Sequence, residues 1–187
     1  NGVGNHEFDE GSPELLRMQF GGCHPVDGCL DGDGFAGAEF SFLSANVIVD
    51  PSSGRTLFPR YEIRVVDGVR IAFIGMTLEG TPLVVSPVAV AGLTFMDEVM
   101  TVNMLVPELQ NLGVEAIVVL VHEGGFQTGL YNHCEGISGQ SVDIAMALDP
   151  AIDVVISGHT HAGYNCVIAG RPVTSALSFG RLITRAS

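Results

Sequence analysis

Two short apolar runs, each followed by a histidine, constrain the fold of this chain more than any other feature. Residues 116–121 are Ala-Ile-Val-Val-Leu-Val and precede His122, while residues 154–156 are Val-Val-Ile and lead through a serine and a glycine to His159. Continuous runs of this length and composition indicate strands buried on both faces, as in parallel sheets. Open α/β sheets place their sites at the carboxyl ends of such strands. We therefore expect His122 and His159 to lie near each other at one edge of a sheet.

The composition limits the kinds of partner. The chain has 187 residues, of which 47% are hydrophobic and 16% charged, so we expect residues 1–187 to form a single globular domain. Lysine is absent, and eight arginines face 21 acidic residues for a net charge of −13. A nucleic-acid backbone requires clustered Lys and Arg, so we expect no nucleic-acid polymer as a partner. No apolar run approaches the roughly 18 residues of a membrane helix, so we expect no membrane partner.

The number of cysteines is even, which is typical of disulfides formed in an oxidising compartment. Four cysteines allow three pairings, and we favour a short bridge from Cys23 to Cys29 across a glycine-rich loop. The second bridge then joins Cys134 to Cys166. A structural zinc site that uses a neighbouring histidine is the alternative, although C-x-x-C spacing is absent. The disulfide interpretation predicts a secreted protein, either extracellular or periplasmic.

Periodicity and turn signals predict the remaining elements. Helices are expected over residues 13–19 with Ser12 as the N-cap, over 95–109 with a kink or break at Pro107, and after Ser138 as a cap through 148. Further strands are expected over residues 40–49, 61–66, 69–74, 164–168, 173–176 and 182–184, with turns at Asp67-Gly68 and Gly170-Arg171.

Residues 20–39 lack helical or strand periodicity and are expected to form a long surface loop. Asp31 and Asp33 lie within this segment, but their surroundings do not follow the order of ligands in an EF-hand calcium loop. We therefore expect turns there and no calcium site. Residues 77–92 are interrupted by prolines and glycines and are expected to connect two elements.

Three segments bring glycine and histidine together: residues 4–7 (Gly-Asn-His-Glu), 122–125 (His-Glu-Gly-Gly) and 158–161 (Gly-His-Thr-His). Neutral imidazole is a common ligand of zinc, iron and manganese. Surface histidines would explain any one of these segments alone. In this order and separation, however, the three resemble the metal-binding motifs of the calcineurin-like metallophosphoesterases. The first and third resemble, more narrowly, the 5′-nucleotidase and 2′,3′-cyclic-nucleotide phosphodiesterase branch, and the resemblance covers nearly the whole chain.

The resemblance implies an α+β fold, an αββα sandwich of two packed sheets flanked by helices, with its amino-terminal part missing. It implies metal-dependent hydrolysis of a small phosphate ester, most specifically a nucleotide, by a secreted or periplasmic protein. The cofactors of the complete site would be two divalent ions, drawn from Zn, Mn, Fe, Mg or Ca. Two such ions about 3.5 to 4 Å apart can hold a hydroxide at neutral pH for attack on phosphorus and clamp the phosphoryl oxygens.

The resemblance also assigns roles to individual residues. Asn5, His122 and His159 correspond to ligands of one ion, and His161 corresponds to a ligand of the other. The family's catalytic histidine corresponds to His6, which would assist the leaving oxygen while Asp9 orients it and keeps it protonated. A cationic imidazole in that position contributes roughly 10²- to 10⁴-fold to the rate.

Two expectations follow from what this stretch of sequence does not contain. In the family, a D-x-H motif and a G-D motif that supply the remaining ligands precede the Gly-Asn-His-Glu motif, which here begins at Gly4, and a carboxyl-terminal domain binds the substrate. We therefore expect residues 1–187 alone to hold at most one ion well and to be nearly inactive. An open sheet edge would also favour self-association.

Two other functions remain open at this point. The chain could be a non-catalytic folded fragment or weak metal-binding module. It could instead belong to a phosphodiesterase or sugar-phosphate phosphatase of the same superfamily.

Overall fold

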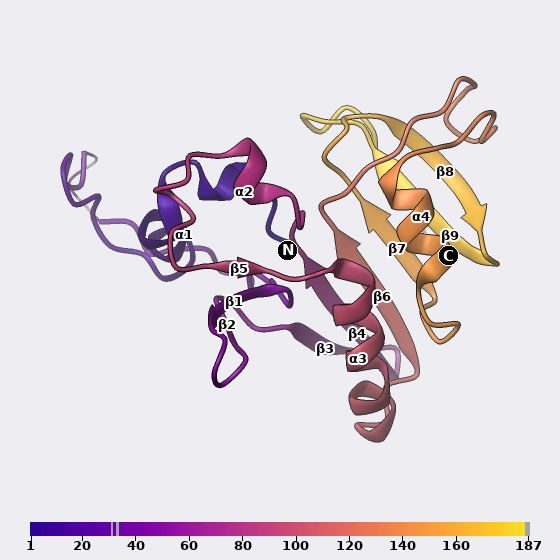
Figure 1. Cartoon of the computed structure of the whole chain (residues 1–187), viewed down its shortest axis with the longest axis horizontal. Helices are drawn as coiled ribbons and strands as arrows, with labels where there is room; N and C mark the ends of the chain where they lie inside the picture. Colours follow the sequence, from indigo (N-terminus) through magenta and orange to yellow (C-terminus); the bar gives the residue numbers. More distant parts are fainter. Residues whose placement is uncertain (31, 33, 186–187) are drawn as a thin grey trace.

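The computed structural model describes residues 1–30, 32 and 34–185 and contains two sheets (Figure 1). The larger sheet has the strand order β3-β4-β6-β7-β9-β8 and is formed by β3 (Tyr61–Val66), β4 (Val69–Met76), β6 (Ala116–Val121), β7 (Val154–Ser157), β8 (Gly163–Ile168) and β9 (Arg171–Ala176). The smaller sheet has the order β2-β1-β5 and is formed by β1 (Val47–Asp50), β2 (Arg55–Thr56) and β5 (Thr94–Phe95). The helices are η1 (His6–Phe8), α1 (Gly11–Phe20), α2 (Thr81–Val84), α3 (Glu98–Asn111) and α4 (Gln140–Ala147).

The centre of the larger sheet is parallel, as the two apolar runs predict. Strand β6 lies between β4 and β7, and both pairings are parallel. Val121 at the end of β6 is opposite Ser157 at the end of β7. The segments that follow, beginning with His122 and Gly158, consequently leave the sheet at the same edge.

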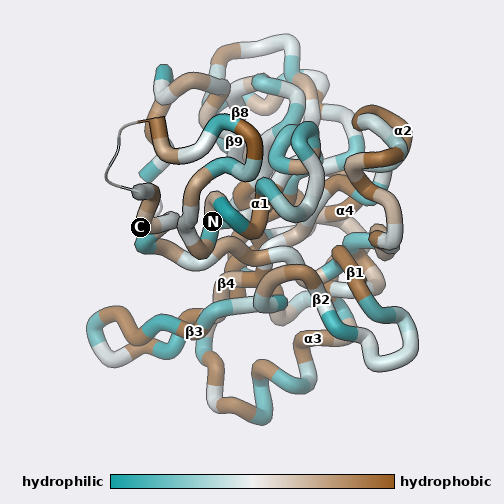
Figure 2. The backbone as a smooth tube through the Cα atoms, turned by 90° about the vertical axis from the view of Figure 1, so that its left-hand side faces the viewer, coloured by the Kyte–Doolittle hydropathy of each residue, from teal (hydrophilic) through white to brown (hydrophobic). Residues whose placement is uncertain are grey.

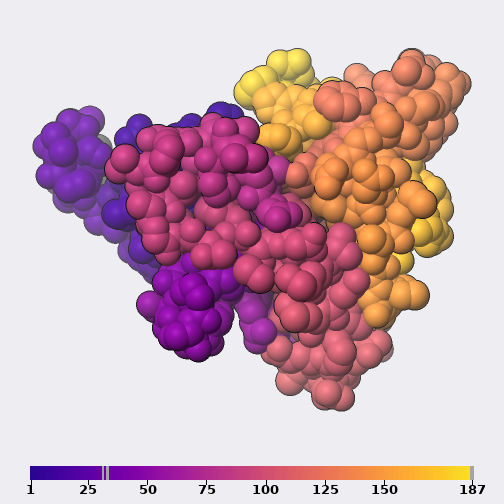
Figure 3. All heavy atoms as spheres, viewed as in Figure 1, coloured from indigo at the N-terminus to yellow at the C-terminus, as the bar shows by residue number. Residues whose placement is uncertain are grey.

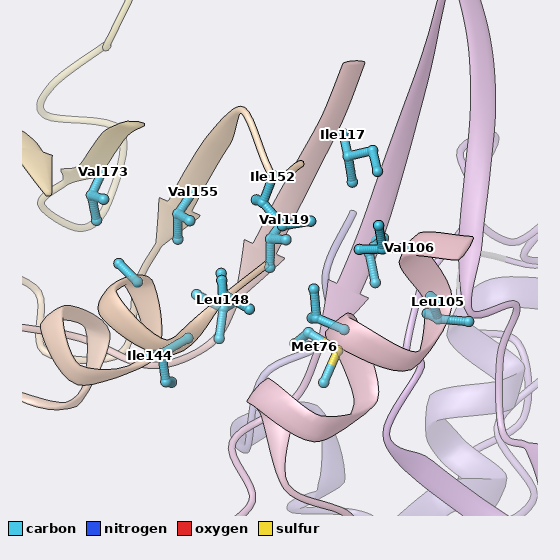
Figure 4. Packing of buried hydrophobic residues seen from close by; sticks show 14 of the residues in the cluster. Met76, Leu105, Val106, Ile117, Val119, Ile144, Leu148, Ile152, Val155 and Val173 are labelled. Carbon is cyan, nitrogen blue, oxygen red and sulfur yellow. The ribbon is translucent and has the colours of Figure 1, made fainter. Parts of the chain in front are cut away.

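Helices α3 and α4 cover one face of this sheet and enclose the main hydrophobic core (Figure 4). In α3, the buried residues at positions 102, 105, 106 and 109 recur at helical spacing and are at most 3% exposed. Burial of each such aliphatic side chain stabilises the fold by about 1.5–3 kcal/mol. The packed helices hold the sheet in place, and the loops at the carboxyl ends of its strands carry the histidines.

A second hydrophobic cluster fixes the segment before α1. Phe8 in η1 is fully buried and packs edge-to-face on Phe95, with ring centroids 5.3 Å apart. Val3 is also fully buried and donates its backbone N–H to the carbonyl of Leu43. Asn5 and His6 lie between these two anchors, so their positions are set by the core on either side.

Several sequence predictions are confirmed in detail. The strand predicted over residues 61–66 has those bounds, and the turn into β4 has positive φ at Asp67 (51°) and Gly68 (88°), as a two-residue hairpin with Asp-Gly requires. Both favoured disulfides are present, one between Cys23 and Cys29 and the other between Cys134 and Cys166. The zinc alternative is thereby excluded for these cysteines.

Two predicted helix caps are wrong. Helix α1 begins at Gly11, so Ser12 lies inside the helix, and Glu10 occupies the N-cap position. The N-cap of α4 is Gly139, because the backbone of Ser138 instead pairs with Phe126 in an isolated bridge.

Four further expectations also need correction. Helix α3 does not break at Pro107, because it continues through that residue as one element of 14 residues. The strand predicted over residues 40–49 begins only at Val47, because Leu43 and Ala45 donate their N–H groups to the separate partners Asn1 and Gly75. The segment 182–184 is not a strand, and the turn between β8 and β9 is centred on Ala169-Gly170, which both have positive φ. Asp31 and Asp33 lie outside the described residues.

The connector over residues 77–92 contains the short helix α2, which presents apolar side chains to solvent. Leu83 is 89% exposed and Val84 is 57% exposed, and the brown colour of α2 in Figure 2 marks this apolar edge. In Figure 3 this magenta segment and the yellow carboxyl-terminal segment both lie at the upper face of the molecule.

Among the described residues, no helix has the length and apolar character that a membrane span requires.

Candidate metal centre

Three side chains from distant parts of the chain converge on one point. The Oδ1 atom of Asn5 lies 2.9 Å from Nε2 of His122 and 3.1 Å from Nδ1 of His159. The two imidazole rings approach each other edge-to-face, with centroids 5.2 Å apart. Asn5 is only 3% exposed, and the histidines follow β6 and β7 directly or after one glycine. One oxygen and two imidazole nitrogens are thus gathered where a single cation could replace their mutual hydrogen bonds.

Glycines make this convergence sterically feasible. A Cβ atom added to Gly4 would lie 2.5 Å from Cε1 of His122, and one added to Gly124 would lie 2.3 Å from Oγ1 of Thr160. Both distances are too short for any side chain to fit without displacing its neighbour. The two glycines therefore belong to the site because their lack of a side chain lets its loops approach.

The loop after β7 is held in an uncommon backbone conformation. His159 and His161 both have positive φ, 64° and 56°. For residues other than glycine this region is sparsely populated, and each instance costs of order 1–3 kcal/mol that surrounding contacts must offset. The contacts here include the bond from Thr160 Oγ1 to the carbonyl of Gly125, at 2.9 Å. Strain of this type is concentrated at functional sites.

The environment keeps the two converging histidines neutral. Burial lowers the pKa of His122 to about 4, and the neighbouring histidines, led by His159, act in the same direction. Burial is also the largest cause of the lowered pKa of His159, followed by His161 and His6. Neutral imidazole is the form that binds metal ions. An amide oxygen and two neutral imidazole nitrogens are therefore the donors that this site could offer to a divalent cation.

His6 and Asp9 form a separate pair at the surface. Nδ1 of His6 lies 2.8 Å from Oδ2 of Asp9, and the side chains are 79% and 52% exposed. The turn of η1 brings them together, because the buried Phe8 anchors its last position and the N–H of Asp9 donates to the His6 carbonyl. The structure thus joins the predicted catalytic pair and leaves the other nitrogen of His6 accessible.

His161 stands apart from the three converging side chains. It is exposed, and its ring contacts Phe179 edge-to-face with centroids 5.6 Å apart. The guanidinium carbon of Arg181 lies 5.1 Å above the Phe179 ring. The sequence analysis missed Phe179 and Arg181. They lie in the loop after β9, which leaves the sheet at the same edge as the histidine loops, and no motif marks them in the sequence.

A cluster of acidic residues was also missed. Ligand-type atoms of Glu79, Asp97 and Glu98 lie within 4.8 Å of one another, and Glu98 is 4% exposed. Oε1 of Glu98 accepts the backbone N–H of Glu79 at 2.7 Å, so part of this arrangement caps a turn. Burial raises the pKa of Glu98, and burial followed by the charge of Glu98 raises the pKa of Glu123 to about 7. No sequence spacing signals this cluster, because the fold alone brings residue 79 to residues 97 and 98.

A cavity adjoins the converging histidines. Its volume is about 220 Å³, and it is lined by His122 and Gly158 together with Leu120, Ile156 and the first two residues of the chain. Ile156 on the central strand β7 is 42% exposed. The side of the sheet opposite α3 and α4 is accordingly accessible next to the site.

Comparison with known proteins gives consistent relatives. The chain is 38% identical over 181 residues to Endonuclease YhcR of Bacillus subtilis, covering 97% of this chain and 14% of that protein. It is 30% identical over 162 residues to the 5′-nucleotidase of Vibrio cholerae, covering 84% of this chain and 25% of that protein. No protein-family model matches the chain.

Among solved structures, the calcineurin-like phosphoesterase YfkN from Bacillus subtilis superposes with a TM-score of 0.69 at 22% identity, covering 94% of this chain and 53% of that one. This likeness confirms the predicted layered α+β fold. The chain spans a quarter or less of the two curated relatives named above. Their sequences and this shared fold confirm the predicted resemblance of the chain to 5′-nucleotidases and calcineurin-like phosphoesterases.

Proposed function

We propose that this chain supplies part of the catalytic site of a metal-dependent phosphohydrolase that acts on small phosphate esters, nucleotides in particular. One observation carries the proposal: the oxygen of Asn5 and the nitrogens of His122 and His159 converge within 2.9 and 3.1 Å. The homologues include 5′-nucleotidases, which are hydrolases. The relatives extend well beyond this chain, so the activity is proposed for the natural gene product in full.

Asn5, His122 and His159 would hold one divalent ion, and His161 would contribute to a second. Two such ions, when bound, activate water as a nucleophile and neutralise charge on the phosphoryl group. The protein's own contribution is to fix the donors before any ion arrives. The buried Asn5 is held between two core anchors, and the histidines are kept neutral by burial.

His6 and Asp9 would act at the leaving oxygen. An imidazole that is hydrogen-bonded through Nδ1 to a carboxylate presents its Nε2–H to the substrate when protonated. Asp9 fixes the orientation of the ring. Both groups lie at the surface, where the organic part of a substrate could approach and depart.

The endonuclease name of one relative favours a second candidate, hydrolysis of a nucleic-acid phosphodiester. That name applies to a protein of which this chain covers 14%. The net charge of −13 and the lack of lysine oppose binding of a long polyanion by this chain. A small phosphate is affected less, because the ions at the site dominate the local field.

The two disulfides support an oxidising location, so we propose that the protein acts outside the cytoplasm, in the extracellular space or the periplasm. Self-association through an open sheet edge stays a prediction. It would be detected as a concentration-dependent mass in sedimentation experiments.

The test of the function is hydrolysis of AMP, of a chromogenic phosphate ester and of single-stranded DNA by the natural gene product with Zn²⁺ or Mn²⁺. We expect phosphate release from AMP, and a loss of roughly 10²- to 10⁴-fold in kcat for the His6→Asn variant. The same assays on residues 1–187 should show almost no turnover. Cleavage of DNA without release of phosphate from AMP would instead favour the endonuclease candidate.

A further inference from the structure

A second cavity lies at the amino ends of β7 and β9, whereas the candidate metal centre lies at the carboxyl end of β7. The two strands are parallel and paired, so the residues that begin them share one edge of the sheet. The cavity has a volume of about 340 Å³. Its lining comes from the end of α4, the segment before β7 and the hairpin between β8 and β9, and it includes Leu148, Ile152, Asp153, Ala169, Gly170 and Arg171.

Arg171 is a buried cation in the wall of this cavity. The residue is 6% exposed, and no described carboxylate lies within 4.0 Å of its guanidinium. Its Nη1 and Nη2 atoms each donate over 3.3 Å to the same acceptor, the carbonyl oxygen of Leu148. Nε is shielded from solvent and has no hydrogen-bond partner among the described residues. These contacts use two of the five N–H donors that a guanidinium carries.

The protein groups around Arg171 neutralise its charge only in part. Leu148 is the C-cap of α4, where the partial charges of a helix sum to about half an elementary negative charge. Asp153 also lines the cavity, but it is exposed, and its Oδ2 atom accepts the backbone N–H of Ile117 at 2.8 Å. Buried charges in proteins are ordinarily paired. Capping of α4 therefore explains the bonds to Leu148, but it does not explain why the whole cation is buried.

The hairpin next to Arg171 adds two backbone donors to the lining. Ala169 and Gly170 are exposed and have φ values of 50° and 81°. They form the turn between the paired residues Ile168 and Arg171, and their N–H groups donate to no other described residue. A Cβ atom added to Gly170 would meet nothing within 4 Å, so the space beside the turn is open. Two backbone donors and a cation without a carboxylate partner thus line the same cavity.

We propose that this cavity is a binding site for a small oxyanion of the phosphate or sulfate class, with Arg171 as the residue that recognises it. A planar guanidinium can donate to two oxygens of such an anion at once, and these bonds are stronger than those between neutral groups. The anion would neutralise a cation that the protein otherwise buries without a carboxylate partner. The inference is independent of the proposed function, because none of the lining residues belongs to the metal centre.

Inorganic phosphate is the probe, added at constant pH and ionic strength in EDTA so that no metal ion recruits it. We expect the amide NMR signals of Ala169, Gly170 and Arg171 to shift with saturation as phosphate is added to residues 1–187. Sulfate should act in the same way and chloride should not, because only an oxyanion offers a pair of oxygens to the guanidinium. Shifts confined to residues 122–125 and 158–161, or the absence of a saturable shift at residues 169–171, would overturn the proposal.

Arg171→Met removes the charge and keeps an unbranched apolar side chain. It should weaken phosphate binding by about tenfold or more, which is the loss expected when a charged hydrogen-bonding group is removed. Arg64→Met is the matched control, because Arg64 is an exposed arginine that pairs with Glu62 on the edge strand β3. It should leave the affinity unchanged. Equal phosphate affinities of Arg171→Met and the wild type would contradict the proposal.

Urea denaturation in EDTA separates anion binding from capping of α4. A ligand that binds only the folded state stabilises it, so phosphate should raise the denaturation midpoint of the wild type more than that of Arg171→Met. The general stabilising effect of phosphate as an excluded salt is common to both proteins. Identical increases would mean that Arg171 only caps the helix and that the proposal is wrong. If Arg171→Met does not fold, the wild-type NMR titration remains the test.

Discussion

The candidate site consists of two groups of side chains that the protein treats differently. Asn5, His122 and His159 are buried or half-buried and contact one another, and glycines leave room for their approach. His6 and His161 are exposed, and each contacts a residue that does not belong to the first group. The first group is assembled by the core before any ion is present, whereas the second is presented to solvent. We infer that the buried group fixes the position of the chemistry and the exposed group meets the substrate.

Metal affinity gives the largest expected difference between the two groups. His122→Ala should weaken Zn²⁺ binding by residues 1–187 by about 100-fold or more, because one of three converging donors is removed. His161→Ala should weaken it by less than about tenfold, since this histidine lies outside the convergent set. Isothermal titration calorimetry gives both values together with the number of ions bound, which we expect to be one.

His133→Ala is the control for that measurement, because His133 is exposed and its Nδ1 atom lies 3.8 Å from Oε1 of Glu135, away from the converging side chains. It should leave the affinity unchanged. Equal losses in His122→Ala and His161→Ala would remove the distinction between the two groups.

A methyl group added at Gly4 tests whether the arrangement of Asn5, His122 and His159 depends on close packing. Gly4→Ala would place a Cβ atom 2.5 Å from the His122 ring, so the ring or the segment before η1 must move. We expect a loss of about 1–3 kcal/mol in the free energy of unfolding, as in other overpacked sites, together with weaker Zn²⁺ binding. Urea denaturation of the metal-free protein measures the first effect and calorimetry the second.

Gly80→Ala is the comparison for this substitution. Gly80 has negative φ, and an added Cβ atom would meet only ordinary contacts at 3.8 Å from Leu78. Its unfolding free energy should change by less than about 0.5 kcal/mol. A similar loss in both variants would mean that the space around His122 is not limiting.

The sequence predicts those parts of the fold and the site that are determined by residues close together in the chain. Turn chemistry and apolar runs predicted β3, β6 and the Asp67-Gly68 hairpin, because the residues that determine them are adjacent in the chain. The meeting of His122 and His159 was also predictable, since parallel neighbours end at one edge. The spacing of the cysteines favoured the observed disulfides, but only the folded chain decides among the possible pairings.

The predictions fail where contacts between residues distant in the chain override the local conformational preference of a residue. Ser138 is a good cap by type, yet its backbone is bonded to Phe126, and Gly139 takes the cap position. The acidic cluster depends on the connector passing close to the start of α3. Phe179 was not predicted as a site residue, because neither periodicity nor a motif marks it in the sequence. Its place beside His161 is visible only in the folded chain.

Glu98 is a buried carboxylate outside the group of Asn5, His122 and His159, and its effect on stability can be compared with theirs. Burial raises the pKa of Glu98, so the folded state holds its proton more tightly than the unfolded chain does. Its contribution to stability is therefore greatest at low pH and is lost as pH rises through the raised pKa. Glu98→Gln keeps an acceptor for the Glu79 N–H and removes the charge.

We expect this variant to match the wild type near pH 4 and to exceed its unfolding free energy by about 1 kcal/mol at pH 8, measured by urea denaturation in EDTA. Glu79→Gln alters an exposed member of the same cluster and should have a smaller effect. A variant that is less stable than the wild type at pH 8 would show that the ionised carboxylate is favourable where it lies.

The smallest expected effect on stability concerns the exposed pair of His6 and Asp9. Both side chains are more than half exposed, so their 2.8 Å contact is solvated and screened by salt. Asp9→Asn should change the unfolding free energy by less than about 0.5 kcal/mol. If Asp9 orients His6 at the leaving oxygen, the same substitution should nevertheless lower kcat of the natural gene product by tenfold or more, roughly. An unchanged kcat with AMP would mean that His6 acts without Asp9. A large loss of unfolding free energy would mean that the pair stabilises the fold, contrary to its exposure. A loss of rate without a loss of stability would show that this pair is placed to meet the substrate and does not build the fold.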